Sequence, residues 1–164
     1  MSGVSARPAP ERTAPERTAA IRRATARLCL QRGWSPLHEV AFANGRRADI
    51  LALRPDGGFA CIEIKSGERD FRADSKWQDY RAFSDALFFA VDLDFPRALL
   101  PEDTGLIVAW DNMAEILRDA PSHPLPPARR KAVTHRFATL AAARLCALED
   151  PEGTALLRIG SRAE

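Results

Sequence analysis

The apolar and polar positions of the chain fall into blocks that indicate helices and strands. Between residues 19 and 32, Ile21, Ala24 and Leu28 recur at spacings of three and four, which places them on one face of a helix. Gly33 follows at the position where helices commonly end. Three short apolar segments come next and predict strands: SPLHEVAF (35–42), ADILAL (48–53) and GFACIEIK (58–65).

Turn residues join these three predicted strands. Asn44 and Gly45 separate the first two, and this dipeptide is a strong hairpin signal. The segment RPDGG (54–58) joins the second strand to the third, and its Pro, Asp and Gly residues favour a tight turn. The second and third strands are apolar on both faces, which predicts a central position covered on both sides.

The second half of the chain predicts further helices and strands. A helix is expected over roughly 71–84, where aromatic residues stand among polar ones. ALFFAVD (86–92) and GLIVAW (105–110) are typical of buried strands, whereas AEILR (114–118) fits either a short strand or a helical turn. A long helix rich in Ala, Leu and Arg is expected over about 128–148. This order predicts an α/β fold with a mixed central β-sheet flanked by helices.

The length of 164 residues allows one domain with a substantial core. We place that domain at 19–150, after a disordered tail over 1–18 that contains the sequence APERT twice, and before a C-terminal extension over 151–164. The chain has no apolar run near the roughly 20 residues that span a bilayer. Its N-terminus lacks the apolar core of a secretory signal. We therefore expect a cytoplasmic protein without membrane contact.

Charge and cysteine content narrow the function classes only slightly. The net charge of +2 gives weak support for nucleic-acid binding. Basic residues do cluster locally, and such patches can neutralise phosphates, but on charge alone solvated helix faces explain them better. Cys29, Cys61 and Cys146 lie far apart among apolar neighbours, which predicts three buried reduced thiols and no zinc site.

The second hairpin brings acidic side chains together. A turn centred on Asp56 sets Asp49 directly opposite Glu63, and strand alternation places Lys65 on the same face. Two facing carboxylates repel each other, and a divalent cation such as Mg²⁺ (or Mn²⁺) would neutralise them, with the Ile64 carbonyl as a further ligand. A metal there would polarise a phosphoryl oxygen and acidify a bound water, which Lys65 would orient or deprotonate.

A surface salt-bridge ladder is the competing interpretation, with Lys65, Arg46 and Arg47 offsetting the two carboxylates. Spacing alone leaves the two interpretations equal. The apolar character of the segment IEIK favours the metal site, because central strands rarely carry unpaired carboxylates without a reason.

The segment RADI (47–50), followed by a turn and CIEIKS (61–66), resembles the PD-(D/E)XK nuclease signature, with Ala48 in place of the proline. The resemblance implies a restriction-endonuclease-like core in which Asp49 and Glu63 bind the metal and Lys65 is catalytic. A further acidic ligand often comes from the first helix or strand of such proteins. Glu39 is the best match, and an ordinary strand-edge glutamate explains it equally well.

A longer stretch is similar to the bacterial MmcB-like DNA repair family. The similarity covers roughly residues 19–148 and is carried by EIKSGERDFRADSKWQDYRAFSDALFFAVD, GLIVAW and ARRKAVTHRFATLAAARL. It implies a role in DNA repair. We therefore expect a Mg²⁺- or Mn²⁺-dependent DNA endonuclease that acts on damaged or branched DNA.

Residues around the signature are candidate DNA contacts, although surface arginines are a near-equal explanation for several of them. The candidates are Arg47, Arg69, Arg72, Lys76, Gln78 and Tyr80. DNA is the expected partner, with repair or replication proteins and a second copy of the chain left open. An inactive DNA-binding or replisome-adaptor protein on a nuclease fold is the alternative, because the chain is small and its net charge modest. A third and weaker hypothesis is a structural component of a repair complex that docks through the APERT tail.

Overall fold

The computed structural model of the chain describes residues 12–160, and within them six strands form one sheet in chain order. Strands β3, β4 and β5 run parallel, while β1, β2 and β6 pair antiparallel with their neighbours. This arrangement confirms the predicted α/β fold with a mixed central sheet. The strands are β1 (Ser35–Ala41), β2 (Arg47–Leu53), β3 (Phe59–Ile64), β4 (Ala86–Asp92), β5 (Gly105–Trp110) and β6 (Met113–Arg118).

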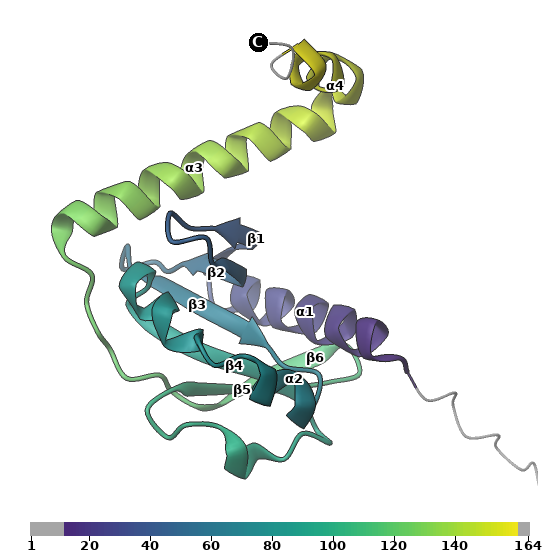
Figure 1. Ribbon diagram of the computed structural model, residues 1–164, viewed down its shortest axis with the longest axis vertical. Coiled ribbons are helices and arrows are strands. Elements are labelled where there is room, and N and C mark those ends of the chain that lie inside the picture. The colour runs from purple at the N-terminus through teal and green to yellow at the C-terminus, as the bar shows by residue number, and fades with distance from the viewer. Residues whose placement is uncertain (1–11, 161–164) are drawn as a thin grey trace, which may run out of the picture.

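Helices flank this sheet (Figure 1). Helix α1 packs along one face, and the short elements between β3 and β4 pack on the other. Helix α3 runs past the β1–β2 hairpin and carries α4 at its far end. The helices are α1 (Ala14–Gln31), α2 (Glu68–Ala73), the 3₁₀ helices η1 (Trp77–Phe83) and η2 (Arg97–Leu99), α3 (Pro127–Glu149) and α4 (Pro151–Gly160).

Side chains alternate between the two faces of the sheet and form two apolar clusters. One cluster joins Ile50 and Ile62 to the buried face of α1. The other joins Leu51, Phe59 and Phe89 to the aromatic residues of η1 and to α3. Every residue of β3 is buried, so this strand holds the central, covered position that its sequence predicts.

Both hairpins form as predicted. Gly45 and Gly57 take positive φ values of 80° and 79° at the two turns, a conformation that glycine adopts without steric cost. In the second hairpin Ile50 faces Ile62 and Leu53 faces Phe59, which confirms the register derived from the turn sequence. The first hairpin contains an irregularity, because Glu39 has a φ of 51° and has no partner in the ladder.

The predicted disordered tail is wrong for residues 14–18, which form the first turn of α1. The second APERT copy starts the helix because the backbone N–H of Thr13 donates to the Glu16 carboxylate at 2.8 Å, as in a capping box. Pro15 sits in the first turn, where the missing N–H costs nothing. Residues 1–11 of the predicted tail lie outside the described residues, as do residues 161–164 of the C-terminal extension.

Two further expectations need correction. The helix predicted over 71–84 is two elements, α2 and η1, because Asp74 leaves the helical region and its carboxylate accepts the Lys76 N–H at 3.3 Å. Asp often competes with helices in this way by binding nearby backbone groups. Of the three cysteines, Cys29 and Cys61 are buried free thiols as expected, but Cys146 is exposed on α3.

A buried carboxylate connects the start of the parallel strands to α3. Asp85 is 2% exposed and accepts the backbone N–H groups of Phe59 at 2.7 Å and Leu125 at 2.8 Å. Arg130 pairs with the same carboxylate at 2.9 Å. These contacts fix the position of β3 relative to the segment that leads into α3.

Replacing Asp85 should therefore destabilise the whole fold. We expect Asp85→Ala to lower the free energy of unfolding by about 3 kcal/mol, because it leaves two buried amides and one guanidinium without their acceptor. Asp103→Ala is the control, since it removes an exposed partner of Arg81 and should cost less than about 1 kcal/mol. Urea denaturation measures both values, and equal losses would contradict this role of Asp85.

Candidate functional site

Two carboxylates face each other across the β2–β3 hairpin. The backbone N–H of Asp49 donates to Glu63 Oε1 at 3.3 Å, and Asp49 Oδ2 accepts the Ile64 N–H at 2.8 Å. Each acid is thus held by the backbone of the opposite strand. The register brings these residues together as the sequence predicts, and Lys65 lines the same pocket.

Burial and mutual repulsion disfavour the charged forms of these two acids, and Lys65 offsets only part of that cost. Glu63 is 4% exposed, and burial raises its pKa to about 8, with the charge of Asp49 adding to the effect and Lys65 opposing it. Burial also raises the pKa of Asp49, while the hydrogen bond from Ile64 lowers it. In the absence of another cation the pair retains a proton near neutral pH, or carries excess negative charge.

Lys65, directly after β3, is held in place by Asp74. Its ammonium lies 2.7 Å from Asp74 Oδ2, and its backbone N–H donates to the Ala90 carbonyl at 3.0 Å. Asp74 stands at the break between α2 and η1. The break between these two elements places the Asp74 carboxylate beside Lys65.

Asp49, Glu63 and Lys65 line an open pocket of about 650 Å³. One wall comes from the first turns of α1 and the other from the segment that follows β3. Arg22 of α1 reaches the pocket, although the sequence placed it only in a general basic cluster. The lining residues are Ala14, Pro15, Thr18, Ala19, Arg22, Asp49, Glu63, Ile64, Lys65, Ser66 and Asp70.

The donor atoms of this pocket suit a hard divalent cation. Mg²⁺ typically binds one or two carboxylates and keeps several waters, and Asp49 and Glu63 offer two carboxylates in one pocket. Ile64, whose carbonyl was the expected further ligand, also lines the pocket. Across residues 12–160, however, no group of three or more His, Cys, Asp or Glu side chains is placed to hold a metal ion.

Glu39 does not join the pair as the expected third acid. The Glu39 carboxylate forms ion pairs with Arg47 at 2.7 Å and with Arg22 at 3.3 Å. Glu39 is not among the residues that line the pocket. The positive φ of Glu39 interrupts the alternation of β1, which sequence spacing assumed to be regular. The geometry supports the interpretation of an ion-paired strand glutamate.

The candidate DNA contacts fall into three groups. Arg69, Lys76 and Gln78 are exposed, whereas Arg47 and Arg72 are exposed but engaged by Glu39 and Glu68. The prediction that Tyr80 contacts DNA is wrong, because this residue is 6% exposed and its hydroxyl donates to the Arg47 carbonyl at 3.0 Å. It packs in the core beside the site and presents no surface for DNA.

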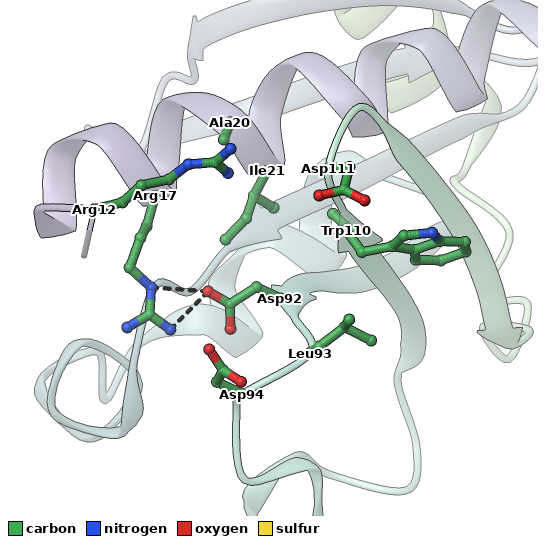
Figure 2. A pocket seen from close by; sticks show the side chains of 10 residues that line it. Arg12, Arg17, Ala20, Ile21, Asp92, Leu93, Asp94, Trp110 and Asp111 are labelled. Atoms are coloured by element: carbon green, nitrogen blue, oxygen red, sulfur yellow. Dashed lines mark hydrogen bonds and ion pairs between the residues drawn. The ribbon is translucent and has the colours of Figure 1, made fainter. Parts of the chain in front are cut away.

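A second pocket, of about 370 Å³, lies on the other side of the first turns of α1 (Figure 2). Arg17 crosses from α1 to Asp92 at the end of β4, with its Nη2 2.6 Å from Oδ2. Asp94 and Asp111 face the same space. Since these acids form no metal-binding group, the contact's evident effect is to fix the start of α1 to the sheet.

Comparison with known proteins gives a family and one similar structure. The family model described as DNA repair protein MmcB-like matches residues 5–152. The SPO1766 protein of unknown function from Silicibacter pomeroyi has a similar structure, with a TM-score of 0.79 and 45% identity, over 87% of this chain and 96% of its own. No curated protein matches the chain. None of the helices described is long and apolar enough to cross a membrane.

The raised pKa of Glu63 predicts a dependence of stability on pH. The folded state binds more protons than the unfolded state between the ordinary pKa of 4.5 and the folded value of about 8, so stability should fall as pH rises through this window. Glu63→Gln should remove much of this fall. A difference of about 1 kcal/mol would shift Tm by roughly 2–4 °C in a domain of this size.

Thermal melts from pH 5 to pH 9 in EDTA test this expectation. Glu68→Gln is the matched control, because Glu68 is an exposed glutamate on α2 and its replacement should leave the pH profile of Tm unchanged. If the wild type and Glu63→Gln lose stability in parallel over this range, the buried pair does not carry the charge described here.

Proposed function

Because the chain belongs to the MmcB-like family of DNA repair proteins, we propose that it is a metal-dependent DNA endonuclease with a PD-(D/E)XK core. The observation that carries the proposal is the pair of facing, largely buried carboxylates Asp49 and Glu63, which share one pocket with Lys65. This combination suits the hydrolysis of a phosphodiester bond during repair. A cytoplasmic location and a homodimer stay predictions.

The chain's own residues would divide the work as follows. Asp49 and Glu63 would hold Mg²⁺ or Mn²⁺ with the Ile64 carbonyl, and the bound ion would supply charge to polarise the phosphate and acidify a water. Lys65, positioned by Asp74, would donate a hydrogen bond to that water or to the phosphate. Arg22, which pairs with Glu39, would be a second cation beside the phosphate.

An inactive DNA-binding or replisome-adaptor protein on the same fold is a second candidate. The observation that favours it is the lack of a three-residue acidic or histidine group among residues 12–160. Two carboxylates are sufficient for Mg²⁺ only if water fills the other positions. Metal affinity therefore separates the two candidates.

The nuclease proposal predicts metal-dependent cutting of DNA. Purified protein should cleave nicked, gapped, flapped or four-way DNA with Mg²⁺ or Mn²⁺ and should be inert in EDTA. Asp49→Ala and Lys65→Ala should each lower the rate at least about 100-fold, because one removes a metal ligand and the other a group acting on the water. Lys131→Ala, on exposed α3, should cut like the wild type.

Calorimetric titration with Mn²⁺ gives the complementary measurement. The nuclease should bind the ion, and Asp49→Ala should bind it much more weakly. A wild-type protein that takes up no Mn²⁺, cuts none of these substrates and still binds DNA would refute the enzyme and support the adaptor.

A further inference from the structure

A third pocket lies where the first turns of α3 pass the turn after β1 and the end of η1 (Figure 1). Its volume is about 570 Å³, and we refer to it as the α3 pocket. It shares no lining residue with the pocket of Asp49 and Glu63, so it is a separate surface. Two of its lining residues are arginines, and the others are apolar: Ala41, Phe42, Ala43, Phe83, Ala132 and Val133.

The two walls of the α3 pocket are bonded to each other. Arg136 Nε donates to the Ala41 carbonyl at 3.2 Å, and Arg144, further along α3, donates to the Glu39 carbonyl at 3.1 Å. Val133 is 4% exposed and belongs to the core cluster of this side of the sheet. The shape of the pocket is therefore set before a partner binds, which lowers the entropy cost of binding.

The two arginines of the α3 pocket, Arg129 and Arg136, are exposed and lack acidic partners. Within residues 12–160 neither forms an ion pair, and no acidic residue lines the pocket. The first turn of α3 contains no acidic residue either, so the positive end of the helix dipole adds to the same potential. An anionic partner would complement this charge.

The arginines stand on either side of an apolar surface. Positions 129, 132, 133 and 136 follow the spacing of one helix face, so Ala132 and Val133 lie between the two cations. A rise of about 1.5 Å per residue separates the two arginines by about 10 Å along the axis of α3. A complementary partner therefore carries two negative charges at about this distance, with an apolar group between them.

The aromatic residues of the α3 pocket do not suit the stacking of nucleobases. Phe42 and Phe83 stack on each other with ring centroids 4.5 Å apart, and the Arg129 guanidinium lies over Phe83 at 4.9 Å. Phe42 is 8% exposed and Phe83 is 6% exposed, so neither ring offers an open face to a base. The alanine and valine side chains between the arginines have no group that could hydrogen-bond to a base or sugar. An aliphatic side chain matches this surface better than a nucleotide does.

From these observations we propose that the α3 pocket is the docking site for an acidic peptide segment of a partner protein, in which two carboxylates flank one aliphatic side chain. In an extended chain every second side chain points the same way, and residues four apart are separated by about 13 Å. The long arginine side chains take up the difference from 10 Å. The expected pattern is an acidic residue, any residue, Leu, Ile or Val, any residue, and a second acidic residue. This inference goes beyond the proposed nuclease and does not depend on it.

Binding of defined peptides tests the proposal. The probes are fluorescein-labelled peptides with this pattern, in which serine fills the intervening positions and glycines flank the ends. One control set has lysine in place of both acids, and another has serine in place of the aliphatic residue. By fluorescence anisotropy the wild type should bind the acidic probes at least about tenfold more tightly than either control set, because each control removes one of the two matched features. Added salt should weaken the binding.

Charge reversal on α3 locates the site. Arg129→Glu and Arg136→Glu should each weaken binding of the acidic probes at least about tenfold, because an attraction becomes a repulsion. Arg23→Glu is the matched control, since Arg23 is an exposed arginine on α1 that does not line the α3 pocket. The double variant with both reversals should bind the lysine peptides more tightly than the wild type does. This gain cannot come from unfolding, and circular dichroism checks that each variant folds.

Labelled single-stranded and duplex DNA are tested with the same proteins. Arg129→Glu and Arg136→Glu should bind and cut DNA as the wild type does. A wild type that binds none of the acidic probes, or binding that survives both reversals, would overturn the docking site.

The remaining outcomes also decide the proposal. Equal losses of peptide and DNA binding in the two variants would assign the α3 pocket to nucleic acid and overturn the peptide site. An equal loss of peptide binding in Arg23→Glu would overturn it as well, because the attraction would then come from the net charge alone. Peptide binding that depends on Arg129 and Arg136, in a protein that cuts no DNA, would support the docking site and refute only the nuclease.

Discussion

The central constraint of the structure is a pair of acidic side chains that repel each other and are kept close together by the backbone of two strands. Asp49 and Glu63 are set opposite each other by the β2–β3 hairpin, and each accepts a backbone N–H from the neighbouring strand. Those two amide contacts, together with Lys65 nearby, offset only part of the cost of burying both acids. Because β3 is fully buried, the remaining cost of placing two acids side by side persists in the folded protein, and a bound cation would lower it.

The part of the site that local sequence rules determine was predictable. The turn around Asp56 and Gly57 sets the register, and the register places Asp49, Glu63 and Lys65 together. Strands β4 and β5 were also predictable, because each is a short apolar run. In these cases neighbouring residues alone determine the structure: the turn sequence sets the hairpin register, and a short apolar run forms a buried strand.

The remaining features depend on contacts between distant segments. Asp74 meets Lys65 where the predicted helix breaks, and Tyr80 packs in the apolar core with its hydroxyl donating to the Arg47 carbonyl. Glu39 pairs with Arg22 and Arg47, and its positive φ interrupts the regular ladder of β1. Such contacts couple a side chain to a backbone conformation elsewhere, and no periodicity along the chain encodes them.

The repeated sequence APERT affects the stability of the first turn of α1, which lies beside the pocket. The threonine that closes the first copy, Thr13, is the residue that precedes the helix built from the second copy. A chain shortened by one copy would still begin the same helical sequence, but Pro8 would stand in front of it, and proline has no N–H for the glutamate to accept. Contraction of this microduplication would thus fray the helix end beside the carboxylates, although no residue of the pocket itself would be altered.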